Sequence, residues 1–461
     1  MRIVAGGDAI FASRGLADRL DPELVDLMTK ADATFANAEF CCPRVGTPPM
    51  PRKFPMGNHA WVLDELRSVG VNLLSTANNH SADFGPQGVL DTIAACEERG
   101  LAFAGTGRSL TEARAASFLD TRAGRVALVA ASSTRSYEFL AGEAGLDVAA
   151  RAGLNPLRWG QAYVLPEEQF AQLRAIDELL GTAAAHRETD RVEVRPDPGP
   201  DVFEFGSVFE GHVRIERGAR PDVRYWCDAG DLASIVASVR DAARRAEVVL
   251  VSLHCHEGVE DGWYHDRSAS FVEHAARACI DAGATAFLGH GPHMLRGVEF
   301  HRGRPIFYSL GSLLYEFEMG ERLTPENYAG YGLGPDSRPS DLHRGRARDE
   351  EGTPTGFYGE ARFSRGALAV LDIDDTGRAA GDHPGGEGPR VRVELVPTDL
   401  GLNRATPSRR GIPSRPAPEE AADGVAELAR MSAAFGTRVD WDAERGVATL
   451  RPGTGAAGAA R

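Results

Sequence analysis

The sequence predicts an α/β protein, because short apolar runs typical of strands alternate with amphipathic runs typical of helices along most of its 461 residues. The composition supports a globular core, since 43% of the residues are hydrophobic and 25% are charged. Acidic, amide and histidine residues also follow one apolar run after another. In folds of this class the carboxyl ends of parallel strands form the ligand-binding edge. The pattern alone therefore predicts a mostly parallel sheet covered by helices, with a site at that edge.

The first part of the chain alternates strands and helices. "RIVAGGD" is expected to be a strand that delivers Asp8, and "DATFANAE" a second strand that ends at Glu39. "GVNLLSTANNH" is expected to be a buried strand that ends in Asn78, Asn79 and His80. The remaining patterns of this part predict helices at 16–29, 59–69 and 86–99 and a strand at 124–132.

The alternation resumes in the second half of the chain. A helix with Ile235, Val236 and Val239 on one face precedes a strand that delivers His254. A helix at 268–282 precedes the strand and loop "GATAFLGHGPH", and "RPIFYSLGS" is expected to be one more strand that ends near the same edge.

Interruptions in these patterns divide the chain into parts. Proline, glycine and charged residues break the periodicity in "RVEVRPDPGPDVFEFGSVFEG", which predicts an insertion with a helix at 166–180. The predicted parts are a metal-dependent domain at 1–400, with this insertion at about 134–222 and a mobile flap at about 319–356, a C-terminal extension at 401–450 that packs on the domain, and a disordered tail at 451–461.

Charge, cysteine content and hydropathy exclude several classes of protein. A net charge of −15 and a pI of about 5.4 argue against nucleic acid or an anionic membrane as a partner. The six cysteines are scattered, which predicts reduced thiols rather than a disulfide framework. The N-terminus lacks a signal-peptide pattern, and no run reaches the length of about 18 apolar residues that a membrane span needs. We therefore expect a cytoplasmic protein.

Candidate ligand residues follow five separate predicted strands. Each residue alone has a simpler explanation, since an aspartate after a strand is usually a turn former and a single histidine is usually a hydrogen-bonded loop residue. Their convergence at one sheet edge instead predicts a metal site. In "GHGPHM" two glycines and a proline restrict the loop, so that its two imidazoles are ordered before an ion binds. The predicted metal ligands are Asp8, Glu39, Asn79, His254, His256, His290 and His293.

The donor types indicate the kind of metal. Carboxylate and amide oxygens together with imidazole nitrogens, without a thiolate, suit a divalent ion such as Mn, Zn, Fe or Ca better than copper or an iron–sulfur cluster. Cys255 lies between His254 and His256, but strand alternation directs it away from them into the core.

Several of these motifs together resemble the CapA family of poly-γ-glutamate capsule synthesis proteins. They are Asp8 after "AGG", "NAE" at 37–39, "ANNHSADFGPQG" at 77–88, "SLHCHE" at 252–257, "GHGPHMLRGVE" at 289–299 and "PIFYSLGS" at 305–312. The resemblance implies a calcineurin-like metallophosphoesterase fold, a β-sandwich core flanked by helices, in place of an open doubly wound sheet. It also implies ligand positions at Asp8, Glu39, Asn79, His254, His290 and His293, with His80 as a catalytic candidate.

The chain departs from the family pattern at some positions. Phosphoesterases of the implied fold begin with Asp-x-His, but Ile10 stands at the histidine position, so one metal subsite lacks a ligand. Cys255 and His256 replace the Trp and Gly of many relatives, and Ser312 replaces a usual Asn.

Three functions agree with these residues: a metal-dependent hydrolase, a metal-dependent peptide epimerase, and a capsule-assembly or binding protein that does not catalyse. Soluble CapA-like proteins include epimerases that act on ribosomally made peptides, and the missing Asp-x-His ligand favours that branch. Asp8 and His293 are the first acid/base candidates, followed by His80 and His254. The expected partner is a peptide or a small polyanionic substrate. Candidate walls of its cleft are Trp159, Phe203, Phe205, Trp226, Trp263 and Tyr264.

Overall fold

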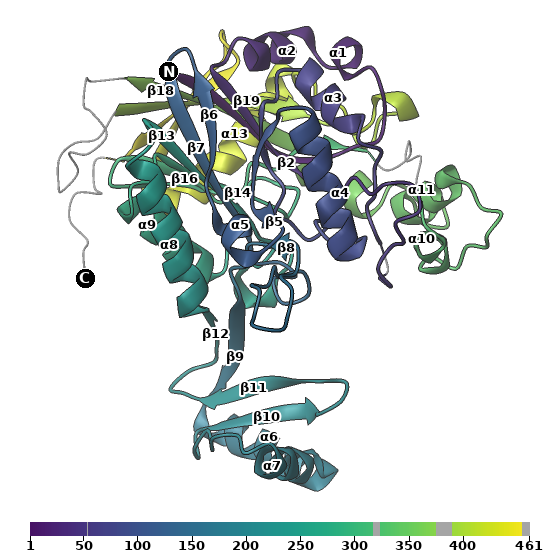
Figure 1. Ribbon diagram of the computed structural model, residues 1–461, viewed down its shortest axis with the longest axis vertical. Coiled ribbons are helices and arrows are strands. Elements are labelled where there is room, and N and C mark those ends of the chain that lie inside the picture. The colour runs from purple at the N-terminus through teal and green to yellow at the C-terminus, as the bar shows by residue number, and fades with distance from the viewer. Residues whose placement is uncertain (53, 317–322, 375–389, 454–461) are drawn as a thin grey trace.

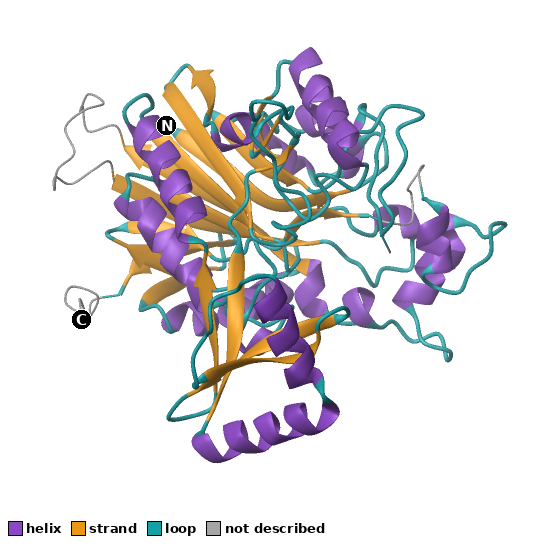
Figure 2. Cartoon of the chain, turned by 60° about the horizontal axis from the view of Figure 1, so that its bottom comes forward, coloured by secondary structure: helices purple, strands orange, loops and turns teal. Residues whose placement is uncertain are grey.

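The computed structural model describes residues 1–52, 54–316, 323–374 and 390–453. Within these residues the core is a sandwich of two mixed β-sheets packed face to face, with helices on both outer faces (Figures 1 and 2). The α/β class is therefore confirmed, and the sheets form a sandwich rather than the open sheet that periodicity alone favours.

The first sheet runs in the order β20-β21-β19-β18-β1-β2-β3-β4, with β17 also paired to β1. The strands β1 to β4 are parallel neighbours, whereas β18 to β21 join them as antiparallel strands. The strands are β1 (Arg2–Ile10), β2 (Ala33–Ala38), β3 (Leu73–Ser75), β4 (Ala102–Ala104), β17 (Ser312–Tyr315), β18 (Arg365–Asp374), β19 (Arg390–Asp399), β20 (Thr437–Asp442) and β21 (Val447–Pro452).

The second sheet runs in the order β15-β16-β14-β13-β7-β6. Its central strands β7, β13, β14 and β16 are parallel. The strands are β6 (Ser117–Thr121), β7 (Gly124–Ser132), β13 (Val248–His254), β14 (Ala286–His290), β15 (Val298–His301) and β16 (Arg304–Phe307).

Apolar side chains from both sheets fill the space between them. Ile3 and Phe35 of the first sheet belong to the same buried cluster as Leu128, Leu250 and Leu288 of the second. Burying a side chain of this size contributes about 1.5–3 kcal/mol. This core fixes the sheets face to face and so brings their parallel strand ends together.

Helices cover the outer faces of the sandwich (Figure 1). Those packed on the first sheet are α1 (Leu16–Arg19), α2 (Pro22–Thr29), α3 (Val62–Ser68) and α4 (Gly85–Glu98). Those packed on the second sheet are α8 (Ala229–Ala243) and α9 (Ser270–Asp281), while the short α5 (Leu110–Arg114) packs beside β5 (Thr106–Gly107). The predicted helices at 59–69, 86–99 and 268–282 are confirmed within a few residues.

Some expected elements are divided in the structure. The helix predicted at 16–29 is interrupted before Pro22, because Asp21 caps the new helix by accepting a hydrogen bond from the Glu23 amide at 2.9 Å. "RPIFYSLGS" forms β16 and β17 in different sheets rather than a single strand. The chain crosses from one sheet to the other through Gly311, whose φ of 72° suits glycine.

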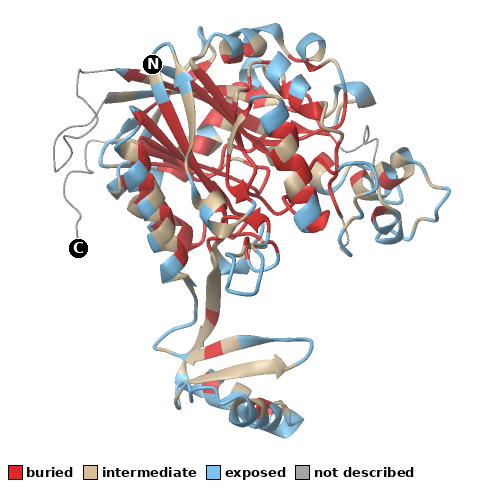
Figure 3. Cartoon of the chain, in the orientation of Figure 1, coloured by how far each residue is buried: buried red, intermediate tan, exposed pale blue. Residues whose placement is uncertain are grey.

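The predicted insertion at 134–222 forms a sheet of its own in the order β10-β11-β9-β12, which extends to Cys227, beyond the predicted end, and projects below the sandwich in Figure 1. Most of its strand residues are only half-buried, in contrast to the strands of the sandwich (Figure 3). The predicted helix at 166–180 is confirmed as α6, but the strands were not predicted, because half-exposed strands carry many charges. The elements are β8 (Gly153–Leu154), β9 (Trp159–Leu165), α6 (Glu167–Leu180), α7 (Thr182–Val192), β10 (Val202–Ser207), β11 (Gly211–Arg217) and β12 (Asp222–Cys227).

The C-terminal part builds onto the sandwich. Within the predicted C-terminal extension at 401–450, β20 and the first residues of β21 extend the first sheet, and α13 (Pro418–Ala433) packs against that sheet. In the predicted flap, the described residues 323–356 contain helices, while 319–322 lie outside the described residues. Of the predicted disordered tail at 451–461, residues 451 and 452 instead complete β21, and 454–461 lie outside the described residues. The remaining elements are α10 (Pro325–Ala329), α11 (Pro339–Ala347), α12 (Ala361–Ser364) and the 3₁₀ turns η1 (Val259–Asp261), η2 (Gly356–Tyr358) and η3 (Pro407–Arg409).

All six cysteines are free thiols. Across the described part of the chain, no helix has the length and apolar character needed to cross a bilayer.

Candidate metal centre

The predicted ligands lie at the carboxyl ends of neighbouring strands from both sheets. Asp8 is near the end of β1, Glu39 directly follows β2, and the segment with Asn79 follows β3. His254 and His290 are the last residues of β13 and β14, which pair side by side. The structure thus brings together ends of strands that are up to 280 residues apart in the sequence, as the α/β pattern predicts.

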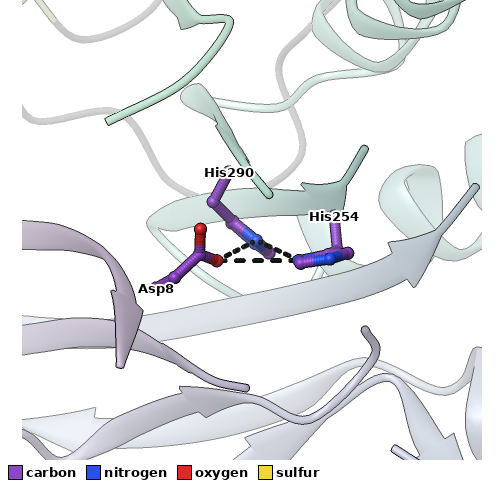
Figure 4. Close-up of side chains that lie close together, drawn as sticks. All are labelled: Asp8, His254 and His290. Atoms are coloured by element: carbon purple, nitrogen blue, oxygen red, sulfur yellow. Dashed lines mark hydrogen bonds and ion pairs between the residues drawn. The ribbon is translucent and has the colours of Figure 1, made fainter. Parts of the chain in front are cut away.

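The first group of donors consists of Asp8, His254 and His290 (Figure 4). The Nδ1 atoms of the two imidazoles lie 3.1 Å apart, and Asp8 Oδ1 is 3.6 Å from the first and 3.2 Å from the second. Donor atoms of a tetrahedral site with bonds of 2.0–2.1 Å are roughly 3.3 Å apart. The triangle therefore has the dimensions of one face of a metal coordination shell.

The second group consists of Glu39, His256 and His293, and it adjoins the first. Asp8 faces both groups, because its Oδ2 atom lies 3.3 Å from His293 Nδ1. Glu39 Oε2 is 3.8 Å from the same nitrogen, and Glu39 Oε1 is 3.9 Å from His254 Nε2. Ile10, in place of the Asp-x-His histidine, packs among apolar residues. The second group therefore contains no histidine at position 10, and His256 supplies an imidazole to it.

Unpaired donors support a metal at this position. The buried atoms Glu39 Oε1, Glu39 Oε2, His254 Nε2 and both ring nitrogens of His256 have no hydrogen-bond partner among the described residues. The predicted ligand Asn79 also has a buried Oδ1 without a partner, and its carbonyl oxygen accepts from Arg52, which also binds Asp83. Buried polar groups without partners are uncommon in native proteins, and each costs about 1–3 kcal/mol. Such a concentration of unpaired oxygen and nitrogen donors is the arrangement that a divalent cation satisfies. The residues therefore fit the predicted cofactor.

Burial determines the protonation of these groups. It lowers the pKa of His254 to about 4, despite the attraction of Asp8, and it lowers the pKa of His256 well below its usual range. Burial also raises the pKa of Glu39 well above its usual range, and the charge of Asp8 adds to this. Burial alone would raise the pKa of Asp8, but the neighbouring imidazoles of His254, His290 and His293 hold it well below its usual range. The imidazoles of His254 and His256 are therefore neutral near pH 7, as metal ligands must be.

Metal binding is expected to release a proton from Glu39 at mildly acidic pH. A raised pKa means that this carboxyl is protonated below that pKa, whereas a ligand must be ionised. Metal affinity should then rise with pH until Glu39 is already ionised in the metal-free protein. Calorimetric titration at pH 6 in buffers of different ionisation enthalpy should show proton release by the wild type. Glu39→Gln should show less release, and equal release by both proteins would contradict the assignment.

Several supporting residues were not predicted. Asn37 Nδ2 donates to Asp8 Oδ1 at 2.8 Å. The hydroxyl of Ser252 lies 2.7 Å from His290 Nε2, and that of Ser312 lies 3.2 Å from His293 Nδ1. These contacts orient the donors, and they involve ordinary polar residues whose roles depend on tertiary contacts. Ser312, a departure from the family pattern, is thus placed beside the centre.

A pair formed by His80 and Asp83 borders the second group. His80 Nδ1 lies 2.6 Å from Asp83 Oδ2, and since a carboxylate only accepts, this nitrogen carries the proton. Asp83 is fully buried, and Arg52 and the Met56 amide also donate to it. The Nε2 atom of His80 then faces Glu39 Oε1 at 3.9 Å as a proton acceptor. The motif "NNHSAD", in which His80 and Asp83 are three residues apart, was the sequence signal that could have identified this pair.

Asp83→Asn is expected to lower turnover about 10- to 100-fold, because the amide no longer fixes the orientation and tautomer of His80. It should also destabilise the fold by about 1–3 kcal/mol, since buried donors lose their acceptor. Histidine ¹⁵N chemical shifts should show that the Nδ1-protonated form of His80 is lost. Asp91→Asn is the control, since Asp91 is also buried and accepts from the Arg44 amide at 2.9 Å. A normal His80 tautomer in Asp83→Asn would refute this role.

The loop after His256 supplies a wall of the centre. Trp263 lies over the His256 ring with centroids 4.3 Å apart, and Tyr264 meets the same ring edge-on at 6.5 Å. The fully buried Arg296 fixes this loop by donating to the carbonyl oxygens of His256 at 2.8 Å and His265 at 3.0 Å. The other predicted wall residues with described ring contacts pack elsewhere: Trp159 on Phe271, Phe203 on Phe170 and Trp226 on Arg224.

Comparison with known proteins identifies similar sequences. The family described as "Bacterial capsule synthesis protein PGA_cap" matches residues 3–316, a range that contains both groups of donors. An uncharacterized protein of Sinorhizobium fredii, y4uA, is 30% identical over 452 residues, which cover 95% of this chain and 90% of that protein.

Relatives with functional names are more distant. A probable polyglutamine synthesis accessory protein of Mycobacterium tuberculosis is 26% identical over 297 residues, 64% of this chain and 56% of that protein. The capsule biosynthesis protein CapA of Bacillus anthracis is 22% identical over 251 residues, 54% of this chain and 42% of that protein. The similarity to these proteins thus covers about half of their length.

Proposed function

Since the chain belongs to the bacterial capsule synthesis protein (PGA_cap) family, we propose that it is a metal-dependent enzyme that epimerises a Cα centre of a peptide. The expected cofactor is a divalent ion, Mn, Zn, Fe or Ca, and the expected partner is a peptide rather than nucleic acid or a membrane. Epimerisation requires a group that removes the Cα proton, a second group that returns one to the opposite face, and stabilisation of the charge between these steps.

The observation that carries the proposal is the position of His80 and His293. They approach opposite oxygens of Glu39, at 3.9 Å and 3.8 Å. Their exposed fractions are 8% and 6%, whereas Asp8, Glu39, His254 and His290 are fully buried. His80 and His293 are thus the least buried of these six residues, and we place the substrate against them, because a two-base reaction needs two such groups.

In the proposed reaction, His293 transfers protons instead of binding metal, which leaves Glu39 and His256 of the second group as ligands. One of the two imidazoles, His80 or His293, takes the Cα proton, and the other donates a proton to the opposite face. Asp83 keeps the proton of His80 on Nδ1, so Nε2 is free to accept. Asp8 is fully buried and its Oδ1 atom lies 3.2 Å from His290 Nδ1, so we assign it to metal binding rather than to proton transfer. A bound divalent cation would supply positive charge that stabilises the negative charge developing on the peptide carbonyl.

Hydrolysis is the second candidate, and a specific contact favours it. The two oxygens of Asp8 face the two donor groups, which is typical of sites where paired metals hold the attacking and leaving oxygens of a phosphoester or amide. The names of the CapA and accessory-protein relatives support a further alternative, a role in poly-γ-glutamate capsule biosynthesis.

Isotope exchange separates these functions. Peptides encoded next to the gene should gain a single deuterium at one α-carbon when incubated with the metal-loaded protein in D₂O, without any loss of chain length. Mass spectrometry measures the label, and chiral amino-acid analysis measures the inversion. His80→Gln and His293→Gln should each stop inversion.

Other outcomes would replace the proposal. Phosphate release from an aryl phosphate, or shortening of a peptide or of poly-γ-glutamate, without deuterium at an α-carbon would favour hydrolysis. Metal binding without either reaction would favour a binding role.

A further inference from the structure

The loop of residues 257–268 contains a strained turn close to the metal centre. Glu260 and Asp261, in the 3₁₀ turn η1, have φ angles of 55° and 59°, in the left-handed region that residues other than glycine rarely adopt. Aspartate tolerates this region better than glutamate, but two such residues in succession persist only where other contacts hold them. The turn therefore depends on contacts with another part of the molecule.

Two tyrosines of the insertion sheet, β10-β11-β9-β12, supply these contacts. Tyr163 of β9 donates its hydroxyl proton to Asp261 Oδ2 at 2.7 Å, and the Asp261 amide donates to the hydroxyl oxygen of Tyr225 in β12 at 2.6 Å. The hydrogen bond to Asp261 raises the pKa of Tyr163 to about 12, so this hydroxyl keeps the proton that it donates. The insertion sheet thus holds both the side chain and the backbone of Asp261.

The two tyrosines lie on a part of the insertion that is fixed to the rest of the protein. In Figure 1, β9 and β12 run from the sandwich to the rest of the insertion. Tyr225 pairs with Gln161, two residues before Tyr163, so both tyrosine side chains project from the same face of the sheet. At the start of β9, Trp159 stacks on Phe271 of α9 with ring centroids 5.4 Å apart. The strands that hold Asp261 are therefore anchored to α9.

The turn connects Asp261 to the wall of the metal centre over two residues. It is closely packed, because a Cβ atom at Gly258 would clash with the carbonyl oxygen of Gly262. Trp263 follows directly, and its ring lies over the ring of His256 with centroids 4.3 Å apart, although Trp263 is 43% exposed. A ring that is this exposed is held less firmly by packing than a buried one. Its position therefore depends on the turn that precedes it.

His256 in turn depends on Trp263 for its orientation. Metal-binding imidazoles are usually oriented by a hydrogen bond from the second ring nitrogen, but neither ring nitrogen of His256 has a partner among the described residues. Four rings contact it instead, those of His254, Trp263, Tyr264 and His293. Of these four, Trp263 is the closest and the most nearly parallel, at 31°. Packing against Trp263 thus takes the place of the usual hydrogen bond.

We propose that Tyr163 and Tyr225 are positioning residues of the metal centre, because they hold Asp261 and, through the turn, fix Trp263 against His256. The insertion sheet then serves to orient one ligand of the second group. The inference rests on the proposed function through the role of His256 as a metal ligand, but it does not depend on which reaction the centre performs.

The double variant Tyr163→Phe/Tyr225→Phe removes both hydroxyls and tests this role in the full chain. With ¹³Cε1-labelled histidine, the Hε1 proton of His256 should lie upfield in the metal-free protein, because the Trp263 ring current shields it. Trp263→Leu gives its unshielded position, and His256→Gln identifies the resonance. The double variant should move the resonance at least about halfway to the unshielded position. Its affinity for Mn²⁺, measured by calorimetry, should fall at least about tenfold.

Variants of Asp261 and of a neighbouring tyrosine supply the controls. Asp261→Asn is the conservative variant, since an amide oxygen still accepts from Tyr163 and asparagine tolerates the left-handed region. It should keep the wild-type resonance, whereas Asp261→Ala should resemble the double variant. Tyr137→Phe should also keep the wild-type resonance, because the hydroxyl of Tyr137 donates to the carbonyl oxygen of Trp159 at 3.3 Å rather than to Asp261.

The proposal would be overturned by an unshifted His256 resonance or an unchanged Mn²⁺ affinity in the folded double variant. An equal shift in Tyr137→Phe or in Asp261→Asn would also overturn it. Where the double variant does not fold, the single variants Tyr163→Phe and Tyr225→Phe decide by the same comparison. Absence of Mn²⁺ binding by the wild type would refute the metal centre itself, and the His256 resonance would still show whether the tyrosines position this ring.

Discussion

Asp8→Asn is expected to lower the affinity for divalent cations at least about 100-fold and to abolish turnover. Asp8 is the fully buried carboxylate that His254, His290 and His293 all face, and the first group of donors has no other anion. An amide keeps the shape of the side chain but removes its charge. Metal analysis after dialysis against a graded series of chelators measures the loss.

Asp231→Asn is a suitable control for Asp8→Asn. Asp231 is equally buried, but it pairs with Arg114 and Arg158 away from the metal centre. This change should lower stability and leave the metal content of the folded protein unchanged. If Asp8→Asn retained metal as tightly as the wild type, the assignment of the first group would be wrong.

Gly7→Ala is expected to destabilise the protein by at least about 3 kcal/mol and to displace Asp8. A Cβ atom at Gly7 would lie 1.9 Å from the carbonyl oxygen of Gly311 and 2.8 Å from its carbon. Both are backbone atoms, so β1 and β17 would have to separate. The Asp8 amide donates a hydrogen bond to the carbonyl oxygen of Gly311 at 3.1 Å, so the separation would also move Asp8. Denaturant unfolding followed by circular dichroism measures the change.

The neighbouring glycine provides the matched control. A Cβ atom at Gly6 would meet the Leu313 side chain at 3.2–3.4 Å, and a side chain can adjust by a few tenths of an ångström. Gly6→Ala should therefore cost much less than Gly7→Ala. Equal stability of the two variants would show that the approach of β1 to β17 does not set the position of Asp8.

The α/β class and the strand ends could be predicted because they depend on local patterns. A strand of apolar residues that ends at His254 needs only its own sequence to be recognised. Alternation also correctly directed Cys255 into the outer apolar cluster, away from the donors. The half-exposed strands of the insertion were missed because their charges obscure the period of two.

Residue roles that depend on tertiary contacts could not be predicted from the sequence. Nothing near Arg296 in the sequence indicates that it is fully buried and fixes the loop of His256. The role of Asn37 likewise depends on the pairing of β1 with β2. The division of "RPIFYSLGS" between the sheets follows from the close approach at Gly311, which no local pattern encodes.

The central claim is that residues from distant strand ends surround a shared cation. Anomalous diffraction from crystals grown with Mn²⁺ tests it most directly. The account predicts an anomalous peak about 2.0–2.3 Å from a carboxylate oxygen of Asp8 and from a ring nitrogen of at least one buried imidazole of the first group, His254 or His290. Full manganese occupancy at a different position, or none at this centre at saturating manganese, would contradict it.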